Sequence, residues 1–273
     1  MLFVLFNGPF TAMILHQGPI NHLAHCRHGL FLYNRQDVFI GRSMEIYGEY
    51  SELELQLLTS LIRAGDVVIE VGANIGTHTV PIAQHVGAEG RVWAFEPQSV
   101  VYQTLCANLA LNSVLNVRAI PNGVAAEALD LGLPVIDYSQ PANYGGIRLL
   151  TEQDEQVIHC VSLDDVVDTD RLALIKIDVE GMECEVLRGA NQLIQNYRPL
   201  LSVENDLSEQ AAKLIDYIRA LDYRMFNSFP PLFNPNNFRG YSGNIFEKIV
   251  SSNLVCVPDE RVADFNLNLE EIV

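Results

Sequence analysis

The sequence predicts an α/β fold in which a doubly wound, mostly parallel sheet is covered by helices. Short runs of β-branched residues recur along the chain, and segments with apolar residues at helical spacing separate them. Strands that alternate with helices are typical of parallel sheets joined by right-handed crossovers. The chain has 273 residues, of which 49% are hydrophobic, and this is enough to bury a large core.

The predicted elements follow one another from residue 53 onward. Leucines and isoleucines at helical spacing predict a helix over 53–62, which Gly65-Asp66 ends. The next run, VVIEV at 67–71, is short and apolar, as expected of a strand that is covered on both faces. Further strands are predicted at 91–97, 116–120, 173–177, 200–204 and 253–258, and further helices at 80–86, 98–111, 183–195 and 208–221.

Three regions do not follow this alternation. Residues 1–50 contain the runs HGLFLY and DVFIGRSMEIYGEY, which predict the strands of a small N-terminal β cap. Residues 121–162 contain several Gly and Pro residues and predict a loop or a β insertion. Residues 227–248 are rich in Pro, Asn and Gly and predict a long loop of the kind that often forms a lid. We therefore expect a cap at 1–50 and the main α/β domain at 51–273.

The formal net charge of −17 limits the partners of the protein. An acidic surface repels phosphate groups, so neither nucleic acid nor an anionic membrane is the expected partner. The five cysteines are scattered without a CxxC pair, which favours a reducing compartment. The apolar start MLFVLFNGPF lacks the basic residues of a signal peptide, and no later run is long enough to span a membrane. We predict a cytoplasmic protein that acts on a small molecule or a glycan.

Three histidines raise the question of a metal site near the N-terminus. His22, His25 and His28 are spaced three apart around Cys26. Ligand pairs on a helix are usually four residues apart, and no carboxylate lies among these histidines. We therefore expect surface histidines rather than metal ligands.

The strongest local signal is EVGANIG at 70–76, which joins a predicted strand to a predicted helix. Gly72 allows a tight turn with a backbone φ that a β-carbon disfavours. Gly76 allows the first helical turn to approach a ligand closely, and the amide groups of that turn point toward the ligand. Asn74 stands where a dinucleotide-binding loop would press its backbone against a pyrophosphate.

A second acidic residue follows at the distance that nucleoside binding requires. Glu96 ends the next strand, and Pro97 fixes the chain as it leaves that strand. A carboxylate at this place accepts hydrogen bonds from both hydroxyls of a ribose. The loop lacks two glycines of the dinucleotide fingerprint, and Glu70 would repel phosphate but attract an ammonium group. These conditions predict S-adenosylmethionine as the cofactor, while an NAD-linked oxidoreductase and a non-catalytic cofactor-binding protein remain alternatives.

At this point the motifs match a known family. In this order and spacing, VIEVGANIGTHT, VWAFEP, VSLDDVV, LIKIDVEGMECEVLRGA and LLSVE resemble the FkbM-type methyltransferases, a branch of the class I S-adenosylmethionine-dependent enzymes. The resemblance implies a seven-stranded, Rossmann-like sheet in the order 3-2-1-4-5-7-6, and methyl transfer, usually to a hydroxyl of a sugar or polyketide. It also implies that the loop 70–76 holds the methionine end of the cofactor and Glu96 the ribose, with Asn122 and Val124 beside the adenine.

The segment LIKIDVEGMECE places carboxylates directly after the fourth predicted strand. Ligands of open α/β sheets bind at the carboxyl ends of the strands, where we expect Asp178 and Glu204 to face the transferred methyl group. A hydroxyl acceptor must lose its proton to a base during the transfer, and Asp178 or Glu180 is the first candidate. His159 is an alternative base.

Two further interpretations of these acids are open. Glu183 and Glu185 stand at a predicted helix N-terminus, where negative charge stabilises the helix dipole. Asp178, Glu204 and Asn205 resemble the oxygen-rich site of Mg²⁺-dependent catechol methyltransferases, and a divalent metal there would lower the pKa of the acceptor. The sequence does not identify the acceptor itself.

Overall fold

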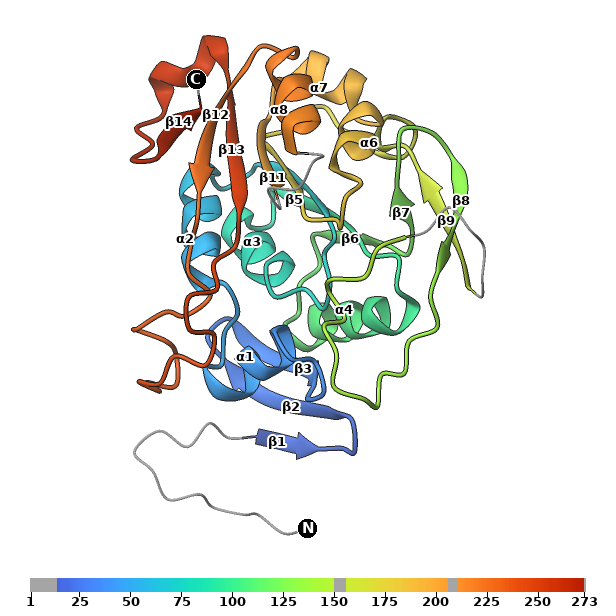
Figure 1. The fold of residues 1–273 in the computed structure, drawn as a ribbon, viewed down its shortest axis with the longest axis vertical. Helices are drawn as coiled ribbons and strands as arrows, with labels where there is room; N and C mark the ends of the chain where they lie inside the picture. The colour runs from blue at the N-terminus through green and yellow to red at the C-terminus, as the bar shows by residue number, and fades with distance from the viewer. Residues whose placement is uncertain (1–13, 150–155, 206–210, 273) are drawn as a thin grey trace.

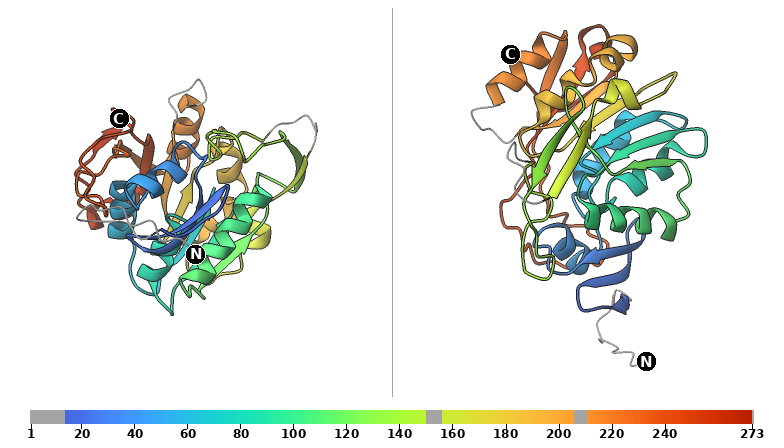
Figure 2. Two further views of the ribbon diagram at one scale, coloured as in Figure 1. Left: turned by 90° about the horizontal axis from the view of Figure 1, so that it is seen from below. Right: turned by 90° about the vertical axis from the view of Figure 1, so that its right-hand side faces the viewer.

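The computed structural model describes residues 14–149, 156–205 and 211–272, so the predicted apolar start at 1–10 lies outside the described residues. Figure 1 shows the central sheet with helices around it, and Figure 2 shows the same layers from two further directions. Among the described residues, no helix is both long enough and apolar enough to cross a lipid bilayer.

The central sheet of the described chain has eight strands in the order β14-β12-β13-β11-β10-β4-β5-β6. From β6 to β12 this is the order 3-2-1-4-5-7-6 that the resemblance implied, and β14 adds a short edge strand. The pairs from β6 to β11 are parallel, whereas β13, β12 and β14 pair antiparallel to their neighbours. The strands are β4 Val67–Val71, β5 Arg91–Phe95, β6 Val117–Ile120, β10 Leu174–Ile177, β11 Leu200–Glu204, β12 Tyr223–Ser228, β13 Asn253–Pro258 and β14 Glu270–Ile272.

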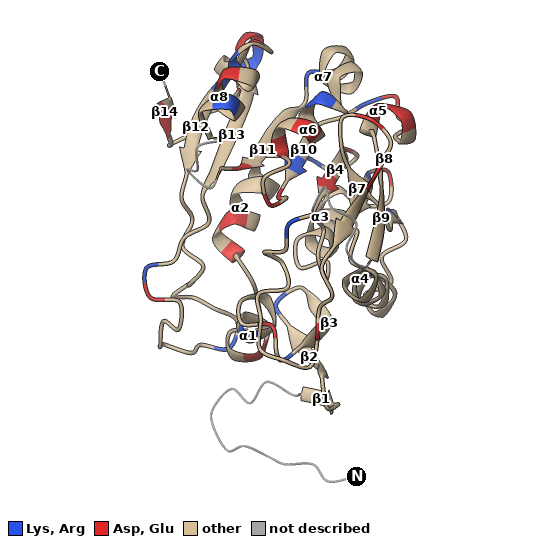
Figure 3. Ribbon diagram, turned by 45° about the vertical axis from the view of Figure 1, so that its right-hand side comes forward, with Lys and Arg blue, Asp and Glu red and all other residues tan. Residues whose placement is uncertain are grey.

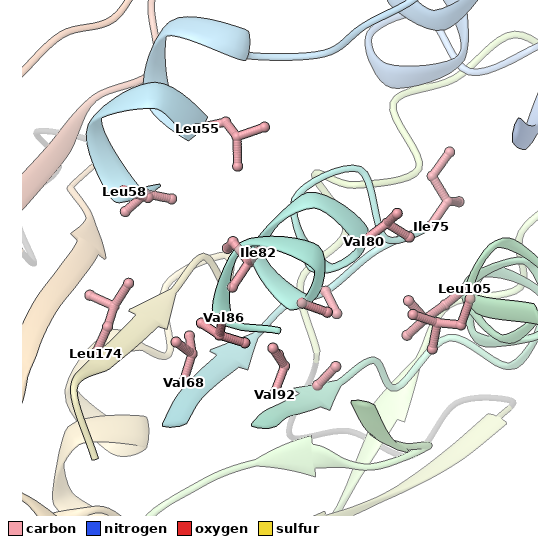
Figure 4. Packing of buried hydrophobic residues seen from close by; sticks show 14 of the residues in the cluster. Leu55, Leu58, Val68, Ile75, Val80, Ile82, Val86, Val92, Leu105 and Leu174 are labelled. Carbon is pink, nitrogen blue, oxygen red and sulfur yellow. The ribbon is translucent and has the colours of Figure 1, made fainter. Parts of the chain in front are cut away.

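Apolar side chains alternate between the two faces of the sheet, and each face carries its own core. Figure 4 shows apolar residues of α2 and α3 packed against Val68, Val92 and Leu174 on one face. Ile69 and Ile175 point into the other core, which α6, α7 and α8 cover. Full burial of one such side chain stabilises the fold by about 1.5–3 kcal/mol, which explains why these strands are apolar throughout.

Most predicted helices are present in the structure. The helices are α2 Glu52–Leu61, α3 Thr79–Val86, α4 Ser99–Leu111, α5 Leu163–Val166, α6 Glu183–Arg188, α7 Asn191–Tyr197 and α8 Ala211–Arg219. The single helix predicted over 183–195 is wrong, because Gly189 separates α6 from α7. A β-carbon at Gly189 would lie 2.1 Å from the carbonyl oxygen of Ala125, so the chain must turn there without a side chain.

The predicted N-terminal β cap is confirmed as a three-stranded antiparallel sheet of β1 Ile14–Gln17, β2 Asn21–Cys26 and β3 Gly29–Asn34. It packs on α4, where the side chain of Asn108 accepts a hydrogen bond from the amide of Leu32 at 2.7 Å. The prediction of a strand within DVFIGRSMEIYGEY is wrong, because α1 Ile40–Ile46 forms there. The side chain of Asp37 accepts hydrogen bonds from the amides of Phe39 and Gly41 at 2.9 and 3.3 Å. These amides at the start of the helix have no partner within it, so Asp37 supplies the acceptor that they need.

The three spaced histidines differ from one another in their surroundings. The surface prediction is wrong for His22, which is 3% exposed, with its ring packed edge-on against Tyr33 and Nδ1 3.3 Å from Glu45. His25 is exposed, and His28 Nε2 lies 2.7 Å from Glu52 Oε2. The burial of His22 could not be predicted from the sequence, because side chains alternate between the two faces of a strand and the sequence does not show which face packs on the core.

Two further segments lie beside the sheet. The region 121–162 contains β7 Gly123–Val124, β8 Leu129–Leu133 and β9 Gln156–Val161 in a second small sheet, which confirms a β insertion. Residues 229–252 contain an isolated bridge but no helix or strand, so the loop predicted at 227–248 is present, except that residues 227 and 228 belong to β12. Figures 1 and 2 show this segment beside α1, where Phe233, Ile245 and Phe246 pack against Tyr47.

Candidate active site

Two adjoining cavities lie at the carboxyl ends of the parallel strands. The main cavity, of about 280 Å³, is lined mainly by polar and acidic side chains, and the side cavity, of about 60 Å³, is lined mostly by apolar ones. Figure 3 shows acidic positions on α2 and around β10 and β11 near a basic segment of β10. Both cavities are lined by Gly72, Glu96, Gln98, Gly145, Asp178 and Glu180.

The glycine loop after β4 passes directly over the end of β10. At Gly72, φ is +85°, and a β-carbon would lie 1.9 Å from the carbonyl oxygen of Asp178. Only glycine fits this contact. Asn74 has φ +49°, and its side-chain Oδ1 accepts a hydrogen bond from the amide of Ile75 at 2.8 Å. The tight loop therefore brings the ends of β4 and β10 into backbone contact at the main cavity.

Gly76 lies outside the lining of both cavities. Its φ is +86°, and a β-carbon there would lie 2.7 Å from Leu105 Cδ1 on α4. Close packing against α4 therefore accounts for this glycine.

Glu96 lines both cavities with its carboxylate held in place by backbone amides. The side chain accepts hydrogen bonds from the amide of Asn74 at 3.0 Å and from the amide of Gln98 at 2.9 Å. The residue is 3% exposed, and burial raises the pKa of Glu96 to about 7. A carboxylate offers about four lone-pair sites, so two hydrogen bonds leave it able to accept more.

Glu70 is the penultimate residue of β4 and lies in the wall of the main cavity. Its Oε2 accepts a hydrogen bond from Thr79 Oγ1 at 2.6 Å. Burial raises the pKa of Glu70 to about 7, although the nearby Lys176 ammonium group opposes this effect. The two residues are partners in the parallel register of β4 and β10. Glu70 is therefore placed to attract a cation, but Lys176 already balances part of its charge.

Lys176 is a buried cation between several acids. It is 2% exposed, and its Nζ donates a hydrogen bond to Asp178 Oδ2 at 2.7 Å. Burial acts to lower the pKa of Lys176, but Asp178, Glu54 and Glu70 together raise it above its ordinary value. Burial likewise acts to raise the pKa of Asp178, but the Lys176 ammonium group holds it below its ordinary value. The Lys176–Asp178 pair is therefore charged at neutral pH.

Glu204 lies beside Asp178, at the end of the neighbouring strand β11. Burial, followed by the charge of Asp178, raises the pKa of Glu204 to about 9. A side-chain hydrogen bond joins Glu204 and Asp178. Because Glu204 is protonated at neutral pH, it is the donor of this bond, and the two carboxyl groups share a single proton.

The remaining predicted residues occupy different places. Pro97, Asn122 and Val124 line the side cavity, where the amide group of Asn122 donates a hydrogen bond to the carbonyl of His159 at 2.9 Å. The His159 ring lies outside both cavities and makes a 2.5 Å contact with Asp130 Oδ1. Glu183 and Glu185 lie in the first turn of α6, and Glu180 lines both cavities.

The sequence of the central domain matches a known family. Residues 70–225, more than half of the chain, match the family described as the Methyltransferase FkbM domain. The chain belongs to this family. The matched region of the FkbM protein holds Glu70, Glu96, Asp178 and Glu204 but ends before the segment 249–253, which also lines the main cavity.

Curated relatives of this FkbM protein are methyltransferases by name. The hexuronic acid methyltransferase AglP of Haloferax volcanii is 28% identical over 162 residues, which are 58% of this chain and 62% of the relative. Methyltransferase sdnD of Sordaria araneosa is 29% identical, and the match covers 46% of this chain and 60% of the relative. The chain spans about three-fifths of the length of these curated relatives.

Solved structures with a similar backbone include another FkbM protein. The methyltransferase FkbM of Methylobacillus flagellatus is 20% identical with a TM-score of 0.49, over 72% of this chain and 45% of that one. Trm5b of Pyrococcus abyssi is 11% identical with a TM-score of 0.49, over 87% of this chain and 56% of that one.

The residues proposed for a divalent metal do not form a suitable oxygen site. The Lys176 ammonium group donates a hydrogen bond to one oxygen of Asp178, and the protonated Glu204 donates another hydrogen bond to the same carboxylate. Asn205 lines a separate small cavity. In the described part of the chain, no group of three or more His, Cys, Asp or Glu side chains is arranged to hold a metal ion.

Several residues of the FkbM site were not predicted from the sequence. Tyr50, Glu54, His78, Lys176 and the segment 249–253 all line the main cavity. Lys176 carried a usable signal, because a lysine inside the apolar run LIKI needs a buried acid as its partner. The others come from segments that adjoin the site only through the tertiary fold.

Proposed function

We propose that this protein is an S-adenosylmethionine-dependent O-methyltransferase that acts on a hydroxyl of a sugar, natural product or other small molecule. The observation that carries the proposal is the pair of adjoining cavities at the ends of β4, β5, β10 and β11, acidic on one side and apolar on the other. Family membership and the methyltransferase names of the relatives support it. The relative from Haloferax volcanii is named for a hexuronic acid, which favours a sugar-like acceptor.

The residues of both cavities fit this cofactor. Glu96 would accept hydrogen bonds from the ribose hydroxyls, and Pro97, Asn122 and Val124 would lie along the adenine in the side cavity. The glycine loop and Glu70 would hold the methionine end, whose ammonium group is attracted by acids. When bound, S-adenosylmethionine supplies an electrophilic methyl group.

Asp178 is the residue that we propose as the base. Its carboxylate lines the main cavity, and Lys176 and Glu204 fix its orientation with hydrogen bonds. Asp178 would accept the hydrogen bond of the acceptor hydroxyl and take up its proton as the oxygen becomes methylated. Alignment of the acceptor by the surrounding walls would supply much of the remaining rate enhancement.

The charge of the main cavity argues against the NAD alternative. Its lining includes Glu54, Glu70, Glu96, Asp178, Glu180 and Glu204, and among the described residues only Lys176 carries a positive charge there. A pyrophosphate would therefore be repelled. The same argument and the net charge of −17 support a small-molecule acceptor rather than nucleic acid.

Calorimetric titration tests the proposed function. The purified protein should bind S-adenosylhomocysteine, the demethylated cofactor, and should not bind NAD. Glu96→Gln should weaken this binding by about 10-fold or more, because hydrogen bonds to a charged group contribute about 1.5–3 kcal/mol. Glu127→Gln, at an exposed position, is the control and should bind like the wild type. Binding of NAD but not of S-adenosylhomocysteine would exclude the methyltransferase.

The non-catalytic alternative needs a separate measurement. Asp178→Asn should reduce methyl transfer from S-adenosylmethionine strongly while leaving S-adenosylhomocysteine affinity close to the wild-type value. A protein that only binds the cofactor would show no transfer in the wild type with any acceptor tried. Equal transfer rates in the wild type and in Asp178→Asn would remove Asp178 from the mechanism.

A further inference from the structure

His78 is a buried residue of the main cavity for which the proposed mechanism gives no role. It precedes the first turn of α3, is 4% exposed and lines the main cavity. Its ring makes a hydrogen bond to the backbone of Ser51. The other ring nitrogen, Nε2, is buried and has no hydrogen-bond partner among the described residues. Buried polar atoms are normally paired, so an unpaired one in a cavity wall indicates a missing ligand.

The protonation of His78 determines which kind of ligand is missing. Burial lowers the pKa of His78, although the nearby Glu54 and Asp178 oppose this effect, so the ring is neutral at neutral pH. The hydrogen bond to the backbone of Ser51 acts to raise the pKa of His78, as a carbonyl acceptor does and an amide donor would not. Because Nε2 has no partner among the described residues, Nδ1 is the nitrogen that donates to this carbonyl. Nε2 then carries a lone pair and can only accept. The missing ligand must therefore present a hydrogen-bond donor.

The neighbours of His78 belong to the wall away from the nucleoside end of the site. The Tyr50 ring lies 6.3 Å from the His78 ring, and Ser51 Oγ donates to Glu54 Oε2 at 2.8 Å. Tyr50 and Glu54 line the main cavity but not the side cavity, where the adenine is proposed to lie. The donor that binds His78 is therefore not on the nucleoside. It belongs to the acceptor molecule or to the methionine end of the cofactor, and we favour the acceptor because Glu70 is the group that faces the methionine ammonium group in the proposed function.

The charged residues of the main cavity restrict the charge that the acceptor can carry. Lys176 is the only lysine or arginine that lines the main cavity in the described part of the chain, and Asp178 already neutralises it. The segments 1–13, 150–155 and 206–210 contain no Lys, Arg or His in their sequence. An anionic acceptor would thus enter a space that holds the ionised Asp178 and, among the described residues, no lysine or arginine left unpaired to meet it, even though Glu204 is protonated there.

We propose that the acceptor end of the main cavity binds an uncharged sugar or polyol, with one hydroxyl donating to His78 Nε2, and excludes uronic acids and sugar phosphates. This inference rests on the proposed function, because it takes the nucleoside end of the site as occupied by the cofactor. A second hydroxyl of the same molecule would lie against Asp178 and be methylated. His78 is then a residue that determines acceptor specificity.

Nuclear magnetic resonance with labelled histidine tests this proposal directly. The full-length protein, saturated with S-adenosylhomocysteine, would be titrated separately with methyl glucoside, the methyl glycoside of glucuronic acid, and glucose 6-phosphate. The His78 Nε2 signal should report the neutral Nδ1–H tautomer and should shift on addition of methyl glucoside. The two anions should need at least about tenfold higher concentrations for the same shift. Equal or stronger effects of either anion, or no effect of methyl glucoside up to its solubility limit, would overturn the proposal.

Cofactor affinity in the His78→Gln variant separates this inference from the proposed function. S-adenosylhomocysteine should bind the variant within about threefold of the wild-type affinity, and the response to methyl glucoside should be lost. A drop of about tenfold or more would show that His78 contacts the cofactor, and the inference would be wrong while the methyltransferase assignment stands. If S-adenosylhomocysteine fails to bind the wild type, the proposed function fails and this inference fails with it. The wild-type titration stays decisive if the variant does not fold.

Discussion

At the scale of single residues, the site depends on the buried ammonium group of Lys176, whose positive charge offsets the negative charges of the acids around it. Lys176 lies within an apolar strand, where an unpaired charge would cost several kcal/mol. Asp178 contacts it directly, and Glu54 and Glu70 lie close enough to raise its pKa. Asp178 remains partly open to the cavity, with 47% of its side chain exposed. The lysine therefore keeps one carboxylate ionised at a place where a ligand can reach it.

Lys176→Met should destabilise the protein by about 3 kcal/mol, because Asp178 and Glu70 would lose their positively charged partner. This value is at the lower end of the range for a broken buried ion pair, since the Asp178 side chain is partly exposed. Adding Asp178→Asn to this variant should recover part of the loss. Urea unfolding of the wild type, both single variants and the double variant measures the coupling. Lys213→Met, at an exposed position on α8, is the control with little effect. Additive losses in the double variant would contradict the charge balance.

Glu204 should make the stability of the cofactor-free protein depend on pH. Its pKa rises from the usual 4.5 to about 9 on folding, so between these values the folded state binds more protons than the unfolded state. Stability must then fall as pH rises through this window, by at most about 1.4 kcal/mol per pH unit for this group. Glu70 and Glu96, with pKa values of about 7, add to the slope mainly below about pH 8.

Unfolding free energies at pH 8 and pH 9 isolate the contribution of Glu204, because Glu70 and Glu96 are almost fully ionised above pH 8, whereas Glu204 is still largely protonated there. Glu204→Gln keeps a donor to Asp178 but no longer titrates, so its slope over this interval should be flatter than that of the wild type. Glu127→Gln should keep the wild-type slope. A wild-type stability that does not fall from pH 8 to pH 9 would show that Glu204 is already ionised in the folded protein.

At the scale of elements, the glycine loop ties β4 to β10 by direct backbone contact at Gly72. The parallel strands were predictable because VVIEV and LIKI are apolar and flanked by turns. β12 Tyr223–Ser228 was not predicted, because its sequence YRMFNS mixes polar and apolar residues and its burial comes from β13 and β14 on either side. α1 was assigned as a strand because the Asp37 contacts that start the helix do not appear as a sequence pattern.

Gly72→Ala should be much more destabilising than Gly65→Ala. The two glycines have similar φ values of +85° and +88°, but a β-carbon at Gly65 would meet nothing within 4 Å. Gly65→Ala should therefore cost about 1–2 kcal/mol for the left-handed backbone alone. Gly72→Ala should cost at least about 2 kcal/mol more and weaken S-adenosylhomocysteine binding. Equal losses in thermal and calorimetric measurements would mean that the contact with Asp178 relaxes freely.

At the scale of the whole molecule, the main cavity is enclosed by segments from both ends of the chain. Tyr50 before α2 and Glu54 in its first turn form one part of the wall, and residues 249–253 form another part. The Tyr47 hydroxyl joins α1 to the region 229–252, because it donates to the carbonyl of Gly243 at 2.8 Å and accepts from the amide of Ile245 at 2.7 Å. The nucleoside end was predictable from contiguous motifs, whereas these walls meet only in the folded chain.

Tyr47→Phe should raise the KM for the methyl acceptor several-fold while leaving S-adenosylhomocysteine affinity unchanged. The substitution removes the hydrogen bonds that hold the region 229–252 against α1, and this region lies away from the nucleoside end of the site. Tyr197→Phe is a matched control, since its hydroxyl donates to the carbonyl of Thr169 at 2.6 Å outside both cavities. Both variants should lose about 1 kcal/mol of stability. A KM that changes equally in both, measured by steady-state kinetics, would argue that stability alone determines the effect.

The hydrogen bonds of Tyr47 also determine how acceptor specificity could be transferred between members of the family. The family-matched region, 70–225, lies between the two wall segments and contributes the nucleoside end. Residues 39–54 and 229–253 contact each other across this region, so neither would keep its shape beside a foreign counterpart. A chimera that takes both segments from one relative should acquire that relative's preference for its methyl acceptor. A chimera that takes only one segment should still bind the cofactor but should bind neither acceptor well.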